Sequence, residues 1–197
     1  MTTQDAPATP MPDLTGVALT TGRLVLKELE PEDIDTVTAI CQDPAIQKWT
    51  MVPAPYTRDD AEAFITGIAP ANRAAGTDAV FGLYQATDGS LLGAIGLHDI
   101  TPGDGRMVSH AEIGFWLAPP ARGRGFMTEA VRAVCRWAFA ELGLDRIEWT
   151  AFVPNEESRR VALRAGFTME GTVRGKRIQR GRVVDEWTGS LLASDSR

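Results

Sequence analysis

The stretch "PPARGRGFMTEAVRAVCRWAF", residues 119–139, places two glycines and two arginines directly before an amphipathic helix. The first turn of a helix has unpaired N–H groups and a partial positive charge, and both favour phosphate binding. Glycines let the backbone approach a ligand closely and adopt positive φ. Arg122 and Arg124 add cations that can pair with phosphate oxygens. Residues 113–128 therefore predict a diphosphate cradle at the C-terminal end of a strand.

Two other phosphate-binding motifs fit this stretch poorly. The spacing of Gly123 and Gly125 resembles a dinucleotide fingerprint, but Thr128 stands at its third glycine position, and the next strand ends at 153–155 without an acidic residue. A Walker loop is excluded, because no Gly-Lys-Ser/Thr follows. Taken alone, the loop also fits an ordinary strand–helix turn that contains glycines.

Composition limits the class of protein. The chain has 197 residues, 44% of them hydrophobic, which fits one domain with a real core. It has no apolar run of membrane-spanning length and no signal-peptide pattern, so we expect a cytoplasmic protein without membrane partners. Cys41 and Cys135 both fall in helical patterns, which argues against a disulfide framework. His98 and His110 lack metal-ligand spacing, so no metal is expected.

Charge is unevenly distributed along the chain. Residues 1–60 hold 4 basic and 10 acidic residues, whereas residues 120–182 hold 13 basic and 7 acidic ones. The formal net charge of the whole chain is −6. An acidic protein with a basic second half favours a local anionic ligand over general nucleic-acid binding. Scattered solvated arginines remain the alternative.

Hydrophobic periodicity and turn signals predict the order of elements. Residues 1–13 are expected to form a disordered tail, and 14–197 a single domain. Strands are expected at 23–29, 79–86, 90–100, 109–119, 145–153, 168–178 and 183–192. Helices are expected at 31–43, 57–68, after the glycines from Phe126, and at 155–167, with Pro70 closing or kinking the second. Residues 46–57 read as irregular. Strand–helix–strand occurs only around 109–153, which predicts one parallel crossover in a mostly antiparallel sheet.

Four segments in this order, "RLVLKEL…PED", "AEIGFWLAPPARGRGFMTEAV", "NEESRRVALRAGF" and "RGRVVDEWTGSLL", resemble the GNAT acyltransferase superfamily, and within it the ribosomal-protein N-acetyltransferase type. The resemblance covers about residues 20–193. It implies a mixed α/β (α+β) fold: a mostly antiparallel central sheet, one parallel βαβ crossover with splayed strands, and helices on both faces.

The resemblance also implies which residues bind the donor. In this family the glycine loop binds the pyrophosphate of acetyl-CoA, and a backbone N–H near Leu117 would hold the thioester carbonyl. Asn155 would hold the pantetheine amides, and the Ser158 hydroxyl would protonate the departing sulfur. From the residues alone, Asn155 is equally an excellent helix N-cap and Ser158 could face solvent. The loop residues assigned to the cofactor are Arg122, Gly123, Arg124, Gly125, Phe126, Met127 and Thr128.

The general base is harder to assign. Glu112 shares a strand face with Gly114 and Trp116 beside the expected acyl group, and desolvation there could raise its pKa. The family often carries a glutamate in the penultimate strand, where this sequence has Arg177. The reserve candidates are Asp185 and Glu186, while a lone strand histidine such as His98 is more often structural.

Trp49 lies in the segment that forms one wall of the acceptor pocket in this family, although packing under the loop explains it as well. Asp59 and Asp60 beside that segment would attract a cationic acceptor.

We therefore expect an acetyl-CoA-dependent N-acetyltransferase that acts on a primary amine, either a protein N-terminus or a small-molecule amine, by direct attack in a ternary complex. Two alternatives stay open: a non-catalytic acyl-CoA-binding module, and the same fold with another donor such as succinyl-CoA, which Arg177 could favour. The protein would be a monomer or homodimer.

Overall fold

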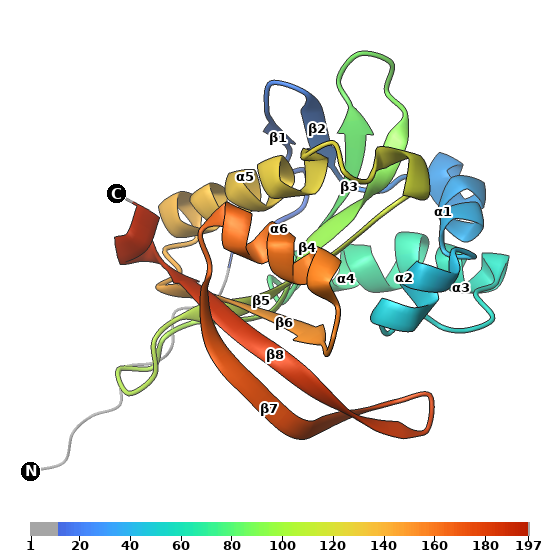
Figure 1. The fold of residues 1–197 in the computed structure, drawn as a ribbon. Coiled ribbons are helices and arrows are strands. Elements are labelled where there is room, and N and C mark those ends of the chain that lie inside the picture. The colour runs from blue at the N-terminus through green and yellow to red at the C-terminus, as the bar shows by residue number, and fades with distance from the viewer. Residues whose placement is uncertain (1–11, 197) are drawn as a thin grey trace, which may run out of the picture.

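The fold is an eight-stranded sheet in the order β1-β2-β3-β4-β5-β6-β8-β7, seen in a computed structural model that describes residues 12–196 (Figure 1). Only β5 and β6 pair in parallel, and the other neighbours are antiparallel, as the single strand–helix–strand segment predicts. The strands are β1 (Leu19–Thr20), β2 (Leu24–Lys27), β3 (Ala79–Gln85), β4 (Leu91–Thr101), β5 (His110–Leu117), β6 (Arg146–Phe152), β7 (Thr168–Gln179) and β8 (Arg182–Leu192).

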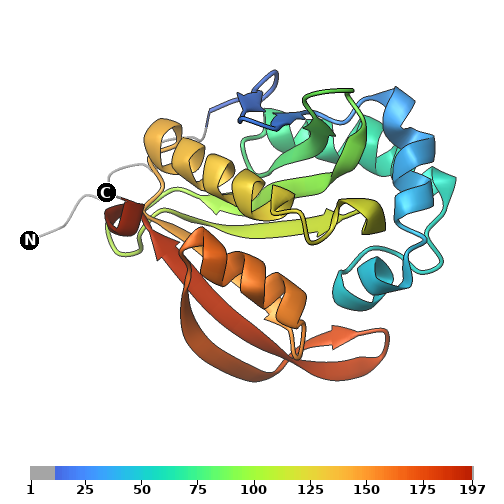
Figure 2. The ribbon, with the colours of Figure 1, turned by 45° about the horizontal axis from the view of Figure 1, so that its top comes forward.

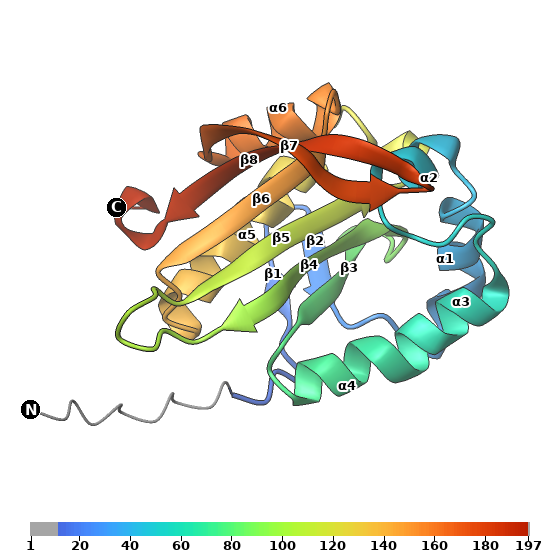
Figure 3. The ribbon, with the colours of Figure 1, turned by 90° about the horizontal axis from the view of Figure 1, so that it is seen from below.

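Helices cover both sides of this sheet. Helices α5 and α6 lie on one face, and the run from α1 to α4 lies on the other side (Figures 1 and 3). The helices are α1 (Ile34–Ile40), α2 (Pro44–Trp49), α3 (Arg58–Ala63), α4 (Ala69–Ala74), α5 (Phe126–Glu141) and α6 (Glu156–Ala165). Short 3₁₀ turns occupy Pro31–Asp33, Pro119–Ala121 and Ala193–Ser196.

Side-chain alternation along β5 assigns its two faces to two hydrophobic clusters. Ala111 and Ile113 are buried in the large cluster that includes the inner face of α5. Trp116 packs instead against the smaller cluster formed by α1, α2 and α3. Since Glu112 has the same parity as Trp116, its side chain lies on the α1–α3 side of the sheet. The strand therefore separates a face covered by α5 and α6 from the opposite face, which packs against α1–α3.

Residues 44–49 form a helix, so the expectation of an irregular segment beginning at residue 46 is wrong for this part. Asp43 caps α2, because its carboxylate accepts the N–H groups of Ala45 and Ile46 at 3.1 and 3.0 Å. Pro44 occupies the first turn, where its missing N–H is unneeded. Asp43-Pro44 thus ends one helix and also begins the next.

The second expected helix continues past Pro70 to Ala74. A π-helical turn at Phe64–Ile68 joins α3 to α4, and the Ala69 N–H bonds to the Phe64 carbonyl five residues back. Pro70 then lies in the first turn of α4, where a proline is tolerated. The expected tail, residues 1–13, falls outside the described residues except for its last two positions.

Candidate active site

The glycine loop leads from β5 into α5 with both glycines in the left-handed region. Gly123 has φ 73° and Gly125, the N-cap of α5, has φ 80°. This conformation favours glycine, which accounts for both positions. The Phe126 and Met127 side chains are buried in the core, so α5 presents backbone N–H groups at this end. Thr128 is half-buried in the same turn.

The two loop arginines differ in what they contact. Arg122 donates from Nε to the Leu117 carbonyl at 3.0 Å and from its terminal nitrogen to Asp43 at 2.7 Å. Burial alone would raise the pKa of Asp43, but bonds from Arg122 and the α2 amides outweigh it and lower that pKa. Arg124 is exposed, with its guanidinium 4.7 Å from the centre of the Phe126 ring. Arg122 thus fixes the loop against α2, while the Arg124 side chain is exposed at the surface of the loop.

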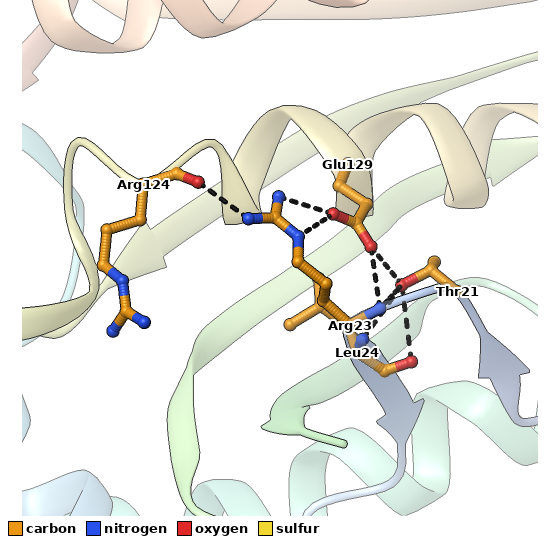
Figure 4. A network of polar contacts seen from close by, with 5 residues as sticks. All are labelled: Thr21, Arg23, Leu24, Arg124 and Glu129. Atoms are coloured by element: carbon orange, nitrogen blue, oxygen red, sulfur yellow. Dashed lines mark hydrogen bonds and ion pairs between the residues drawn. The ribbon is translucent and has the colours of Figure 1, made fainter. Parts of the chain in front are cut away.

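A polar network ties the start of β2 to the first turn of α5 (Figure 4). Arg23 donates to Glu129 at 2.7 Å and to the Arg124 carbonyl at 3.0 Å, and the Thr21 hydroxyl donates to the same carboxylate at 2.5 Å. Burial favours a raised pKa for Glu129, but the Thr21 and Arg23 bonds lower it. Because these partners are more than 100 residues apart along the chain, no pattern in the sequence predicts the network.

A groove rich in arginine runs beside this network along the outer face of α5. Its volume is about 620 Å³. Arg23, Arg132, Arg136 and Arg164 line it, with Glu129 as the one carboxylate. The positive charge of the second half of the sequence is therefore partly concentrated beside the glycine loop.

Strands β5 and β6 pair only over their first halves. The parallel register runs from His110 opposite Arg146 to Ile113 opposite Trp149, whereas β5 continues to Leu117 and β6 to Phe152. The separation begins after Ile113, at the same end of β5 that carries the glycine loop. The splayed pair that the family resemblance implies is thus present.

The backbone of Leu117 faces this separation. Leu117 lies opposite Gly93 in the antiparallel ladder with β4. The next residue, Ala118, donates its N–H to Leu92, which makes Leu117 and Gly93 a non-hydrogen-bonded pair. The N–H of Leu117 therefore points away from β4, toward the side on which β6 has separated.

Asn155 and Ser158 lie at the start of α6, on the face of the sheet that α5 and α6 cover. The Asn155 side chain accepts the Ser158 N–H at 3.2 Å, so Asn155 is the helix cap. Trp149 donates its indole N–H to the Ser158 hydroxyl oxygen at 3.0 Å. Since an indole N–H can only donate, the hydroxyl must accept here, and its own proton remains available to another acceptor.

Glu112 lies on the opposite face of the sheet. The Thr150 hydroxyl donates to its carboxylate at 2.8 Å, and His98 stands opposite it on β4. His98 in turn lies 3.8 Å from the Asp78 carboxylate. Glu112 is half-buried, so one face of the sheet brings a carboxylate and an imidazole together near the separation of β5 and β6.

The two reserve carboxylates have different surroundings. Asp185 is exposed and accepts the Gly175 N–H at 2.8 Å, which holds an irregular part of β7. Glu186 is 2% exposed and accepts from Arg177 Nε at 2.6 Å. The bond to Glu186, and then the charges of Glu112 and Asp99, raise the pKa of Arg177.

The segment that carries Trp49 is held by the β7–β8 turn, whose tip reaches α2 (Figure 2). Arg180 donates to the carbonyls of Gln47 and Val52 at 2.6 and 3.2 Å, and Gln179 donates to that of Lys48 at 2.5 Å. Trp49 is half-buried, with the Lys48 ammonium 4.3 Å from its ring centre.

Among residues 12–196, none of the helices has the length and hydrophobicity needed to span a membrane. The same residues contain no group of three or more His, Cys, Asp or Glu side chains that could hold a metal ion. Both cysteines are buried and unpaired.

Known proteins are similar to this chain in sequence and in fold. The family model for the acetyltransferase (GNAT) domain matches residues 23–168. A provisionally named ribosomal N-acetyltransferase of Bacillus subtilis (strain 168), YdaF, is 44% identical over 87 residues, and the match spans 44% of this chain and 45% of that relative, less than half its length. An uncharacterised N-acetyltransferase of Bacillus licheniformis, p20, is 30% identical over 175 residues, covering 88% of this chain and 95% of the relative.

One solved structure is that of the microcin C7 self-immunity acetyltransferase MccE in complex with acetyl-CoA and AMP. It superposes with a TM-score of 0.79 and 20% identity, over 91% of this chain and 98% of the other. At this level of identity the likeness shows the fold.

Proposed function

Since this chain belongs to the GNAT acetyltransferase family, we propose that it transfers an acetyl group from acetyl-CoA to a primary amine in a ternary complex. The observation that carries the proposal is the place of the glycine loop. The loop begins α5 at the end of β5 where β5 and β6 have separated. A diphosphate at the loop would therefore lie beside the gap into which a pantetheine arm can extend.

Residues 122–128 would hold the pyrophosphate, chiefly through backbone N–H groups and the exposed Arg124. Arg122 would act less directly, because its side chain binds Asp43 and the Leu117 carbonyl. The arginine groove along α5 offers cations to phosphate that extends beyond the loop. MccE, which has this fold, was solved with acetyl-CoA bound.

In the proposed reaction the amine nitrogen attacks the thioester carbonyl carbon. A C–N bond forms, the C–S bond breaks, and CoA leaves as the thiol. The Leu117 N–H would stabilise the developing oxyanion, and Ser158 would give its proton to the sulfur. Glu112 would receive the proton that the amine loses, directly or through water. The acid and the base then lie on opposite faces of the sheet.

The acceptor would be a protein N-terminus or a small cationic amine. A protein N-terminus is supported by the name of YdaF, which describes a ribosomal N-acetyltransferase. A cationic amine is supported by the exposed carboxylate of Asp59 at the start of α3, in the acidic part of the chain. We further propose that residues 14–197 act as one domain, as a monomer or a homodimer.

Acetyl-CoA fits better than succinyl-CoA, which would need a cation near its terminal carboxylate. Arg177, the cation that favours succinyl-CoA in the sequence, is paired with the buried carboxylate of Glu186 at 2.6 Å. A succinyl group would have to compete with this ion pair.

Thiol release from acetyl-CoA and succinyl-CoA tests the proposal, with an alanine-starting peptide, a serine-starting peptide, spermidine and n-butylamine as acceptors. We expect acetyl-CoA-dependent release with at least one amine, and a large loss of kcat/KM in Glu112→Gln with unchanged CoA binding. CoA binding without release in any combination would identify a binding module instead. Full activity of Glu112→Gln would remove it as the base.

A further inference from the structure

The Glu186 carboxylate is only half satisfied. Its Oε1 accepts from Arg177 Nε at 2.6 Å, whereas its Oε2 is buried and has no hydrogen-bond partner among residues 12–196. The side chain as a whole is 3% exposed, so the unpaired oxygen is shielded from solvent. A buried acceptor without a partner is costly, and more so when it is charged. A bound ligand that donates a hydrogen bond to this oxygen would remove the cost.

The register of the sheet puts Glu186 at the end of β6. It lies opposite Phe152, the last residue of β6, and two positions from Thr188, which lies opposite Thr150. Side chains of equal parity share a face, so Glu186 lies on the same face as Thr150, whose hydroxyl binds Glu112. Glu186 is therefore beside the separation of β5 and β6, on the face away from Ser158.

Carboxylates are the charges that act on Arg177. Glu186 binds its guanidinium directly, and the charges of Glu112 and Asp99 further raise its pKa. Arg177 satisfies only one oxygen of Glu186, so a ligand with a positive charge and N–H donors would satisfy the other.

Building on the proposed function, we propose that Glu186 Oε2 accepts a hydrogen bond from the amine of the acceptor substrate, which is a cationic primary amine that enters on the face opposite α5 and α6. Arg177 is a positioning residue: because it binds Oε1, it leaves Oε2 as the oxygen that can accept from the amine. Its side chain is 40% exposed, so the cation lies between the buried Glu186 carboxylate and solvent.

The test compares Glu186→Gln with Glu170→Gln. In Glu186→Gln the amide oxygen can still accept from Arg177, but an NH₂ group replaces Oε2 and donates where an acceptor is needed. Glu170 is the matched control, because it also sits on the β7–β8 pair and binds an arginine, Arg146, at 2.7 Å. It lies toward the other end of these strands, where its side chain reaches Arg146 at the start of β6.

Two readouts use n-butylamine as the probe, with the full chain saturated with CoA or acetyl-CoA. The first is its affinity, measured by NMR titration of the CoA complex. The second is kcat/KM for n-butylamine in thiol release, together with KM for acetyl-CoA. For Glu186→Gln we expect at least tenfold weaker butylammonium binding and at least tenfold lower kcat/KM, with KM for acetyl-CoA unchanged. Glu170→Gln should match the unaltered protein in all three.

Equal amine affinity and equal kcat/KM in the two variants would overturn the inference, and so would an unaltered protein that does not bind butylammonium at any soluble concentration. These outcomes are separate from a failure of the proposed function. That failure would be the absence of thiol release with every acceptor, whatever the amine-binding data show.

Discussion

At the residue scale, Gly125 combines a backbone conformation that favours glycine with a proposed role in CoA binding. Its φ of 80° disfavours any other residue, and it is the N-cap of the helix that would meet the diphosphate. Gly125→Glu adds a side chain and a negative charge there, so calorimetry should show CoA affinity falling more than tenfold, or about 1.4 kcal/mol.

Gly143→Glu is the control for this change. Gly143 also has positive φ, 63°, and a Cβ there meets nothing within 4 Å, but it lies beyond the C-terminal end of α5. Both variants should lose a similar amount of stability from backbone strain. Equal CoA affinity in the two variants would contradict the proposal that the glycine loop binds the diphosphate of CoA.

The Ser158 hydroxyl is oriented by the Trp149 indole, which leaves its proton free to be donated. If Ser158 protonates the departing thiolate, Ser158→Ala should lower kcat by roughly 10²-fold with little effect on CoA affinity. Ser158→Thr keeps the hydroxyl and should recover part of the rate. Normal turnover of Ser158→Ala at saturating substrates would instead assign the residue to the packing of Trp149.

At the element scale, the β7–β8 turn holds α2 and the segment after it. Arg180→Ala removes the bonds to Gln47 and Val52, so amide hydrogen exchange in residues 44–52 should become about tenfold faster while the sheet stays protected. Arg182→Ala, in the same hairpin, is the control, since no such bond to α2 is present for it within residues 12–196. Unchanged exchange in Arg180→Ala would show that α2 is held by its own packing.

Local signals in the sequence predict most elements correctly. Asn155, an expected helix cap, does cap α6 through its side chain. Helix α2 was missed because Asp43-Pro44 is both a stop and a start signal. The glycine loop could be predicted for the same reason as the caps: its residues are adjacent in the sequence.

Contacts between distant segments could not be predicted in this way. Arg23 meets Glu129 only after the sheet has formed. The pairing of Arg177 with Glu186 depends on a shift in register between Val173 and Arg177, which simple alternation does not reveal. Arg177 and Glu186 were each singled out in the sequence, but their ion pair was not.

At the scale of the whole molecule, acid should unfold the protein through its carboxylates. The pKa of Glu170 is lowered mainly by its bond to Arg146, and the pKa values of Asp43 and Glu129 are lowered although burial opposes it. A folded-state pKa below the unfolded value stabilises the fold above the unfolded pKa, and that contribution is lost as pH falls through the folded one.

Urea unfolding at a series of pH values should therefore give a nearly constant free energy from about pH 6 to 8, and a steep fall below about pH 4. Burial raises the pKa of the Cys41 and Cys135 thiols to about 12, so they add nothing in that range. Glu170→Gln should make the fall of the unfolding free energy below about pH 4 less steep. A free energy that declines evenly from neutral pH downward would contradict this account.

The separation of β5 from β6 also has a consequence for the order of events in solution. Ser158 stands on one face of the sheet and Glu112 on the other, with the unpaired edge of β5 between them. If the two substrates approach from opposite faces, as proposed, neither blocks the path of the other, and the acetyl group passes to the amine without first being bonded to the protein. Reciprocal initial rates plotted against reciprocal acetyl-CoA concentration, at several fixed acceptor concentrations, should then give intersecting lines. Parallel lines would mean that the first product leaves before the second substrate binds.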